Sequence, residues 1–334
     1  MNRRIVLARR PHGEPAATDF RMETVEIPSL EVEGVLLKTR QLSLDPYMRW
    51  RMDAGESYAP PVAIGAPMIG STISEVVASR NDAFHEGDLV LGRSGWQDFA
   101  VSDGHGLRRL DPAVAPVSTA LGVLGSPGLT AYSGLLNIGQ PKAGETLVVA
   151  AATGPVGSLV GQIAKIKGCR TVAIAGGAEK CRYALDVLGF DAAIDHRSAD
   201  LEAQLKTACP AGIDVYFENV GGRVWDAVHP LFNTFARIPV CGLISQYNDA
   251  SEAHPTGSAE LMRTILVKRL TIRGFIVTDF ASQFDAFQRD VGGWLASGQV
   301  VHREQFVDGL EAAPEAFIGM LKGQNFGKLI VRVS

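Results

Sequence analysis

The residues best suited to do chemistry in this 334-residue chain form a glycine-rich turn. Thr153-Gly154-Pro155-Val156-Gly157-Ser158 follows an apolar run, Thr146–Ala152, and precedes a helix-forming stretch. Small residues let the backbone approach a pyrophosphate, and the first N–H groups of a helix have no partner within it. The turn therefore predicts a dinucleotide-phosphate site. Its spacing, A-x-x-G-x-x-G, is a weaker signal than G-x-G-x-x-G.

The end of the next predicted strand separates NAD(H) from NADP(H). An NAD-specific site normally places Asp or Glu about 20 residues after the glycine turn, against the ribose 2′-hydroxyl. Here the strand Arg170–Ala175 ends at Gly176-Gly177, with Lys180 shortly after. A lysine in this corner suits a 2′-phosphate, so the pattern favours NADP(H). Glu179 could still reach a ribose, which leaves NAD(H) as the alternative.

Two patterns of apolar residues must position these groups. Up to about residue 115, β-rich runs alternate with turn residues, which indicates a small β-rich domain; the runs are Gly34–Leu44, Met68–Ala78, Asp88–Leu91 and Trp96–Val101. From about Pro127, helices such as Leu159–Lys167 and Lys180–Leu188 alternate with apolar strands, as in a doubly wound parallel sheet; the strands are Leu147–Ala152, Thr171–Ala175, Ala192–Asp195, Val215–Glu218 and Arg237–Cys241. A last strand, Gly327–Val333, could join either sheet.

Composition and charge exclude several classes of function. A net charge of −4 without a run of like charges argues against a nucleic-acid or anionic-membrane partner. The uncharged segment Thr146–Ala164 has about the length of a membrane span, but Gly154 and Pro155 interrupt it. The first residues lack the apolar stretch of a secretory signal, so a cytoplasmic location is expected.

The cysteines and histidines predict no metal site. Cys169, Cys181, Cys209 and Cys241 are widely spaced, and no histidine lies near them in a ligand spacing. We expect Cys169 and Cys241 to be small buried hydrophobic residues. The chain also lacks H-E-x-x-H and G-x-S-x-G, so zinc proteolysis and serine hydrolysis are not expected.

Several long strings resemble the zinc-independent medium-chain reductases, in the group that holds NADPH-dependent curcumin reductase, prostaglandin/leukotriene B4 reductases and plant alkenal double-bond reductases. They are LSLDPYMR (Leu42–Arg49), GSPGLTAYSGL (Gly125–Leu135), Gly144–Cys181, GIDVYFENVGG (Gly212–Gly222), ARIPVCGLISQYN (Ala236–Asn248) and FIGMLKGQNFGKLIV (Phe317–Val331). The resemblance covers nearly the whole chain. It implies a GroES-like β-rich domain, residues 1–126, rejoined by about 297–334, and a Rossmann NADP(H)-binding domain, 127–296. It also implies a homodimer, with which an edge strand at Leu270–Val277 is compatible.

The same resemblance suggests residues for each part of the cofactor. It assigns the turn Gly154–Ser158 to the pyrophosphate and Lys180 to the 2′-phosphate. It suggests further cofactor contacts at Asn219, Cys241, Gly242, Leu243, Ile244, Ser245, Gln246, Tyr247, Phe275, Ile276, Val277 and Asn325. The chain departs from the pattern at Asp195-His196-Arg197, where relatives commonly have Tyr then Lys. His196 could stack on or donate to the phosphate, or be a surface-turn histidine, while Arg197 keeps the positive charge.

The expected chemistry is hydride addition to a carbon–carbon double bond conjugated to a carbonyl. The zinc ligands of alcohol-oxidising relatives are absent, and Leu42–Arg49 holds no cysteine. Charge developing on the carbonyl oxygen needs only a neutral hydrogen-bond donor, for which the resemblance favours Tyr247. The α-carbon proton could come from solvent or through Tyr247.

Tyr47 is the second catalytic candidate. We expect it to orient the substrate carbonyl, although it could simply pack over the Asp45-Pro46 turn. Arg49 and Arg51 could receive a substrate carboxylate, but exposed arginines are expected there. The prediction is an NADPH-dependent reductase of 2-alkenals and enones, with curcumin-like dienones among the candidate substrates. The alternatives are a quinone reductase of the same fold and a non-enzymatic cofactor-binding protein.

Overall fold

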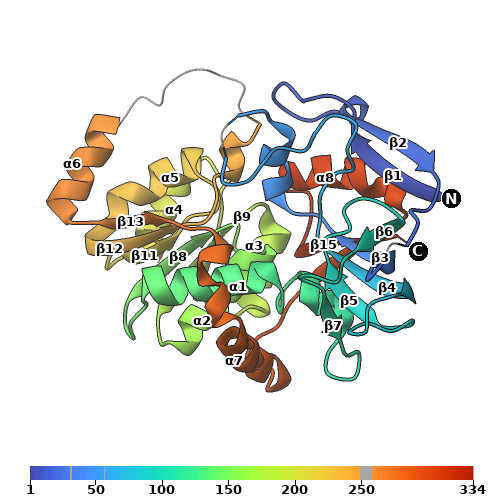
Figure 1. The fold of residues 1–334 in the computed structure, drawn as a ribbon. Coiled ribbons are helices and arrows are strands. Elements are labelled where there is room, and N and C mark those ends of the chain that lie inside the picture. The colour runs from blue at the N-terminus through green and yellow to red at the C-terminus, as the bar shows by residue number, and fades with distance from the viewer. Residues whose placement is uncertain (31, 56, 249–257, 334) are drawn as a thin grey trace. The chain divides into compact units, whose positions relative to one another are not determined.

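The computed structural model describes residues 1–30, 32–55, 57–248 and 258–333. They divide into two compact units. Unit 1 comprises Met1–Gly122 and Glu304–Ser334, and unit 2 comprises Val123–Arg303. Unit 1 contains two sheets and unit 2 one (Figure 1). Each unit has its own hydrophobic core.

Unit 2 is built on a six-stranded parallel sheet. Its strands are β8 (Thr146–Ala150), β9 (Arg170–Ala175), β10 (Ala192–Asp195), β11 (Ile213–Phe217), β12 (Phe232–Val240) and β13 (Thr271–Gly274). Their order is β10-β9-β8-β11-β12-β13, and each neighbouring pair is parallel. The chain therefore runs outward from β8 to β10 and returns to β11 on the other side of β8. In such sheets, ligands bind at the carboxyl ends of the strands where the order reverses, here between β8 and β11.

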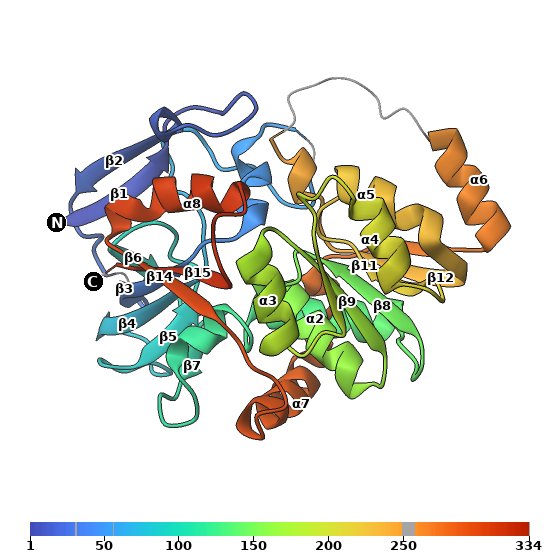
Figure 2. The same cartoon turned by 180° about the vertical axis from the view of Figure 1, so that it is seen from behind.

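Helices cover both faces of this sheet because successive side chains of a strand point to opposite faces. Leu147 and Val149 of β8 belong to the core that includes α2, whereas Val148 and Ala150 belong to the core that includes α4 and α5. Figures 1 and 2 show these helix layers from opposite sides. The helices are α1 (Ser126–Ser133), α2 (Pro155–Ile166), α3 (Ala178–Asp186), α4 (Leu201–Ala208), α5 (Gly222–Val228), α6 (Ser258–Lys268) and α7 (Phe284–Ala296), and a π-helix (Gly134–Gly139) follows α1.

Unit 1 contains a seven-stranded sheet and a separate two-stranded sheet, β1-β2. The strands are β1 (Asn2–Leu7), β2 (Phe20–Val25), β3 (Val35–Ser43), β4 (Thr72–Ser79), β5 (Leu89–Gly92), β6 (Phe99–Ser102), β7 (Arg108–Leu110), β14 (Glu304–Asp308) and β15 (Lys328–Arg332), and α8 (Ala313–Leu321) is an α-helix of this unit. The larger sheet has the order β14-β15-β3-β4-β5-β7, with β6 also paired to β3. The last strand of the chain, which could have joined either sheet, pairs with β3 in unit 1.

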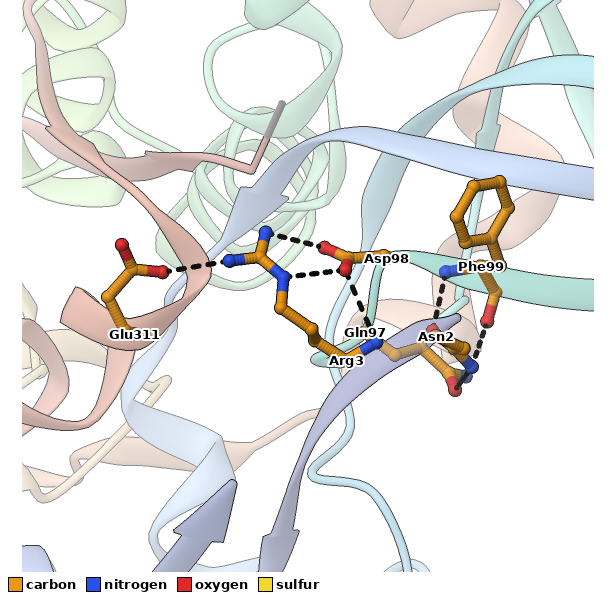
Figure 3. Close-up of polar contacts among 6 residues, drawn as sticks. All are labelled: Asn2, Arg3, Gln97, Asp98, Phe99 and Glu311. Carbon is orange, nitrogen blue, oxygen red and sulfur yellow. Dashed lines mark hydrogen bonds and ion pairs between the residues drawn. The ribbon is translucent and has the colours of Figure 1, made fainter. Parts of the chain in front are cut away.

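The N-terminal strand of unit 1 is fixed by a charged side chain (Figure 3). Arg3 donates from Nε and Nη2 to the two carboxylate oxygens of Asp98, at 2.8 and 3.1 Å, and from Nη1 to Glu311 at 3.4 Å. Asn2 exchanges hydrogen bonds with the backbone of Phe99 at 2.9 and 3.0 Å. Asp98 is largely buried, so its negative charge requires this two-pronged partner.

These two architectures confirm the predicted fold class: a β-rich GroES-like domain and a doubly wound parallel Rossmann sheet. No helix among the described residues is both long enough and apolar enough to cross a membrane.

Candidate active site

The glycine-rich turn follows β8 and starts α2. Gly154 is the N-cap of α2, and its N–H donates to the Ala151 carbonyl at 2.9 Å. A Cβ on Gly157 would lie 2.4 Å from that same carbonyl oxygen, so only glycine lets the helix begin this close to the strand end. Ser158 makes the first of the helical hydrogen bonds back to Gly154, at 3.0 Å. The N–H groups that precede it have no helical partner and suit a pyrophosphate.

Four basic side chains gather beyond the ends of β9 and β10. We call Lys180, His196, Arg197 and Arg223 the cationic corner. A Cβ on Gly176 would lie 2.8 Å from His196 Nε2 and 3.4 Å from Arg197 Nε, so both side chains lie over the glycine pair that ends β9. Arg223, at the start of α5, donates to the carbonyl of His196 at 3.0 Å and to that of Ser198 at 2.6 Å. Three separate elements therefore contribute to one basic cluster.

The cationic corner carries an excess of positive charge. Burial lowers the pKa of Lys180, and the Arg197 guanidinium lowers it further. Burial also lowers the pKa of His196; Asp195 opposes this shift, whereas Arg197, Lys180 and Arg223 add to it. Like charges that disfavour one another in this way are stabilised by a bound anion. The corner thus fits the 2′-phosphate that distinguishes NADP(H) from NAD(H).

The Asp195 carboxylate in this corner is directed to the backbone, whereas the Glu179 carboxylate acts on Lys180 and opposes the lowering of its pKa. Asp195 accepts the Arg197 N–H at 2.9 Å. Although burial alone would raise the pKa of Asp195, backbone hydrogen bonds from Gly177 and Arg197 lower it overall. These donors hold the acid at the end of β10, one strand away from the position that an NAD-specific acid takes. Arg223 was not among the predicted cofactor residues. The feature of the sequence that could have indicated it is an arginine directly after the turn NVGG, residues 219–222.

Two residues at the end of β11 organise the point where the strand order reverses. Asn219 donates from its side-chain amide to the Ala150 carbonyl at 2.8 Å, which ties β11 to β8. Glu218 is buried and accepts from the N–H groups of Val220 and Gly221, at 2.6 and 2.9 Å, and from the Tyr216 hydroxyl at 3.1 Å. Burial raises its pKa despite these bonds. No role for Glu218 was expected from the sequence.

The segment Cys241–Tyr247 is anchored to the same place. The N–H groups of Cys241 and Gly242 donate to the Glu218 carbonyl, at 2.9 and 3.2 Å. The Tyr247 side chain is buried and its hydroxyl accepts the Leu243 N–H at 3.3 Å. A Cβ on Gly242 would lie 2.9 Å from that hydroxyl, so the phenol rests on the backbone of its own segment.

The expectation of buried cysteines is confirmed for Cys169. The side chain of Cys241 is only partly buried, and it packs against the core of unit 2. Its thiol is not prepared for reactivity, because burial and the Glu218 charge raise its pKa to about 12.

Phe275 directs its side chain into the core of unit 2. Its ring lies edge-to-face on Phe217, with centroids 6.2 Å apart, and on Phe280 at 5.9 Å. Ile276 and Val277 are partly exposed. A cofactor contact at Phe275 would therefore use its backbone.

The remaining candidates lie in unit 1. Tyr47 is part of a 3-10 turn, Pro46–Met48, and packs against the unit 1 core. Burial and the Asp45 charge raise the pKa of its phenol, while Arg93 and Arg51 lower it by smaller amounts. Asn325 donates from its side-chain amide to the Gly327 carbonyl at 2.9 Å.

The expectation of an exposed Arg49 was wrong. This side chain is buried and donates to the Asp53 carboxylate at 2.6 Å and to the Gly13 carbonyl at 2.8 Å. Its role is to hold the turn 49–53 to the segment at Gly13, because a buried guanidinium requires such partners.

Two family models match the chain: "N-terminal domain of oxidoreductase" over residues 3–110 and "Zinc-binding dehydrogenase" over residues 155–291. The chain is 56% identical over 336 residues to NADPH-dependent curcumin reductase of Escherichia coli, covering 100% of this chain and 97% of that protein. This chain belongs to the medium-chain dehydrogenase/reductase family. Prostaglandin reductase 1 of Rattus norvegicus is 44% identical, with 96% of this chain and 95% of that protein covered.

Solved structures of this family include CurA from Vibrio vulnificus in complex with NADPH. It is 53% identical, has a TM-score of 0.95, and is covered over 99% of both chains. Quinone oxidoreductase from Escherichia coli has a TM-score of 0.78 at 18% identity, with 99% of both chains covered, which shows the shared fold alone. The predicted family and the predicted oxidoreductase class are confirmed. Although one matching model is named for zinc, the described part of the chain has no group of three or more His, Cys, Asp or Glu residues that could hold a metal ion.

Proposed function

We propose that this protein uses NADPH to reduce the carbon–carbon double bond of α,β-unsaturated aldehydes and ketones. The cationic corner is the observation that carries the choice of cofactor, because its four basic groups occupy the place where an NAD-specific site would have an acid. The substrate class is supported by relatives named for curcumin and prostaglandin reduction, and by a 2-alkenal reductase of Nicotiana tabacum that is 39% identical.

The described residues suit each part of this cofactor. The turn Gly154–Ser158 would hold the pyrophosphate and the cationic corner the 2′-phosphate. Asn219 and the segment Cys241–Tyr247, with the backbone near Phe275, would border the adenosine, ribose and nicotinamide. When bound, NADPH supplies the hydride.

Tyr247 is proposed to stabilise the charge that develops on the substrate carbonyl oxygen when hydride adds to the β-carbon. Its hydroxyl oxygen accepts the Leu243 N–H at 3.3 Å, which holds the phenol against the backbone of the segment Cys241–Tyr247. A donor fixed beforehand in this way stabilises an enolate without costly reorganisation. The α-carbon proton then arrives from solvent or through Tyr247.

Unit 1 is proposed to be the substrate domain, and unit 2 the cofactor domain. Tyr47 would orient the substrate carbonyl, and the raised pKa of its phenol keeps it a proton donor over the neutral range. Asn325, also in unit 1, remains a proposed cofactor contact.

The test is NADPH consumption by the purified protein with trans-2-nonenal, 3-nonen-2-one, curcumin, 1,4-benzoquinone and a saturated ketone, with NADH in parallel. We expect turnover of the enals and enones, a preference for NADPH, and recovery of the saturated carbonyl compound. Turnover confined to the quinone would favour the quinone-reductase alternative. NADPH binding without any turnover would favour a non-enzymatic role.

A homodimer formed through β13 is also proposed. β13 lies at the edge of the unit 2 sheet and pairs on its inner side with β12. Exposed apolar side chains lie nearby in sequence on α6, at Met262, Leu266 and Val267. An open edge strand can pair with its copy across a two-fold axis. Size-exclusion chromatography with light scattering should give twice the chain mass, and a monomer mass would exclude this dimer.

The cytoplasmic location stays a prediction.

A further inference from the structure

The turn that carries Tyr47 starts at an aspartate that does not cap it. Asp45 is the N-cap of Pro46–Met48, a position from which Asp commonly accepts a backbone N–H of the turn. Here the side chain makes no such bond. One carboxylate oxygen accepts from Lys328 Nζ at 2.5 Å, and the other accepts from the Ser43 hydroxyl. The carboxylate is therefore drawn back toward β3 and β15.

Lys328 holds the start of this turn through two further contacts. Its Nζ also donates to the Leu44 carbonyl at 2.9 Å, and the Leu44 N–H donates to the Leu329 carbonyl at 3.2 Å. Its aliphatic stem packs over Gly122, where a Cβ would lie 3.3 Å from Lys328 Cγ. The first residue of β15 is thus tied to the residues directly before Tyr47.

The depth of this ion pair sets it apart from others in unit 1. The side chains of Lys328 and Asp45 are 3% and 15% exposed. Lys322 and Glu14 also form a pair at 2.5 Å, but their side chains are 45% and 49% exposed. Buried charges hold their geometry closely because a shift would leave one of them unpaired, whereas exposed pairs contribute little.

We propose that Lys328 is a positioning residue for enone reduction, which holds the Asp45–Tyr47 turn so that the Tyr47 hydroxyl meets the substrate carbonyl. This inference rests on the role proposed above for Tyr47. Lys328 itself is not a catalytic residue, because it acts only through Asp45 and Leu44. Its substitution should therefore cost activity only while Tyr47 has a hydroxyl to position.

A double-mutant cycle tests this dependence. The proteins are the wild type, Tyr47→Phe, Lys328→Met and the double variant, and the measurement is kcat/KM with 3-nonen-2-one. Each single substitution should lower kcat/KM by about 10-fold or more, because small misplacements of an orienting group are costly. The kcat/KM of the double variant should then not fall more than about 3-fold below that of the less active single variant, because the effects of coupled residues are not additive.

A second comparison separates positioning from stability. Lys328→Met leaves the Asp45 carboxylate unpaired, so its thermal midpoint should fall. Adding Asp45→Asn removes both charges and should recover much of the midpoint without recovering kcat/KM. Lys322→Met removes the exposed pair of the same length and should leave both measurements unchanged.

The outcomes distinguish a positioning role of Lys328 from a purely structural one, and both from the role of Tyr47. If the losses from Tyr47→Phe and Lys328→Met multiply, or if Asp45→Asn/Lys328→Met recovers kcat/KM along with stability, Lys328 supports only the fold and the inference is wrong. If Tyr47→Phe retains full activity, the role of Tyr47 fails and this inference fails with it, while NADPH-dependent enone reduction by Tyr247 is untouched.

Discussion

At the scale of single residues, we expect the preference for NADPH to depend on the whole cationic corner and not on Lys180 alone. Arg223 lies on α5, which follows β11, whereas Lys180 lies on α3, which follows β9, and β8 lies between these two strands. The Arg223 guanidinium nevertheless donates to the backbone carbonyls of His196 and Ser198. It therefore both adds charge and fixes the segment that carries His196 and Arg197.

Replacing Arg223 should weaken NADPH binding specifically. Arg223→Met is expected to raise the Kd of NADPH by about 10-fold, from the loss of a charge-assisted contact, and to change the Kd of NADH by less than about 2-fold. Arg182→Met, which removes an exposed arginine on α3, is the matched control. Equal losses for both cofactors would contradict an interaction with the 2′-phosphate.

His196 should make NADPH affinity depend on pH. In the cofactor-free protein its pKa is lowered by burial, with Arg197, Lys180 and Arg223 adding to the shift and Asp195 opposing it. A bound 2′-phosphate raises that pKa, so binding takes up a proton and affinity should rise as the pH falls from about 8 to about 6.5.

Titration calorimetry at several pH values measures this effect, with NADH as the ligand without the phosphate. Because the phosphate itself titrates near pH 6, His196→Gln provides the reference for that part of the dependence. A wild-type pH profile identical to that of His196→Gln would show that the imidazole does not sense the phosphate.

At the scale of elements, the junction of β8 and α2 tolerates no side chain at Gly157. Gly157→Ala should raise the Kd of NADPH by at least about 10-fold, because its Cβ would lie 2.4 Å from the Ala151 carbonyl oxygen and would displace the turn. Gly293→Ala on α7 is the matched control, since a Cβ there meets nothing within 4 Å and should stabilise the helix by up to about 1 kcal/mol. Unchanged NADPH binding by Gly157→Ala would contradict the close approach.

The attachment of β1 through Arg3 and Asp98 predicts that two ion pairs of unit 1 contribute differently to the free energy of unfolding. Asp98→Ala should lower the free energy of unfolding by about 1–3 kcal/mol, because it removes a charged acceptor from a partly buried guanidinium and from a strand backbone. Asp308→Ala removes a carboxylate that is 78% exposed and paired with Arg332, and should change it by no more than about 0.5 kcal/mol. Urea unfolding measures both. Similar values for the two variants would contradict a structural role for the β1 attachment.

The sequence predicted these elements well where the local pattern determines them. The predicted strands Thr171–Ala175 and Ala192–Asp195 lie at β9 and β10, because a short apolar run between turn residues is typical of a buried strand. It could not choose a sheet for Gly327–Val333, because an apolar strand pattern fits either core. It also missed the burial of Arg49 and the position of Arg223, since both depend on contacts between segments distant in sequence.

At the scale of the whole molecule, a chain of net charge −4 concentrates four basic groups in one corner of unit 2. Net charge therefore says little about the local field that an anionic cofactor meets. Every residue of the glycine turn, the cationic corner and the Tyr247 segment belongs to unit 2, whereas Tyr47 and Lys328 belong to unit 1. Most of the proposed cofactor contacts therefore belong to unit 2, whereas Tyr47, proposed to orient the substrate carbonyl, and the proposed cofactor contact Asn325 belong to unit 1.

In the proposed reaction, hydride reaches the β-carbon of a conjugated double bond. The most direct test supplies 3-nonen-2-one and NADPH deuterated at both C4 positions, and locates the label in the product by NMR and mass spectrometry. We expect nonan-2-one with one deuterium at C4, the former β-carbon. An alcohol that carries the deuterium at the former carbonyl carbon would show instead that the enzyme reduces the carbonyl group.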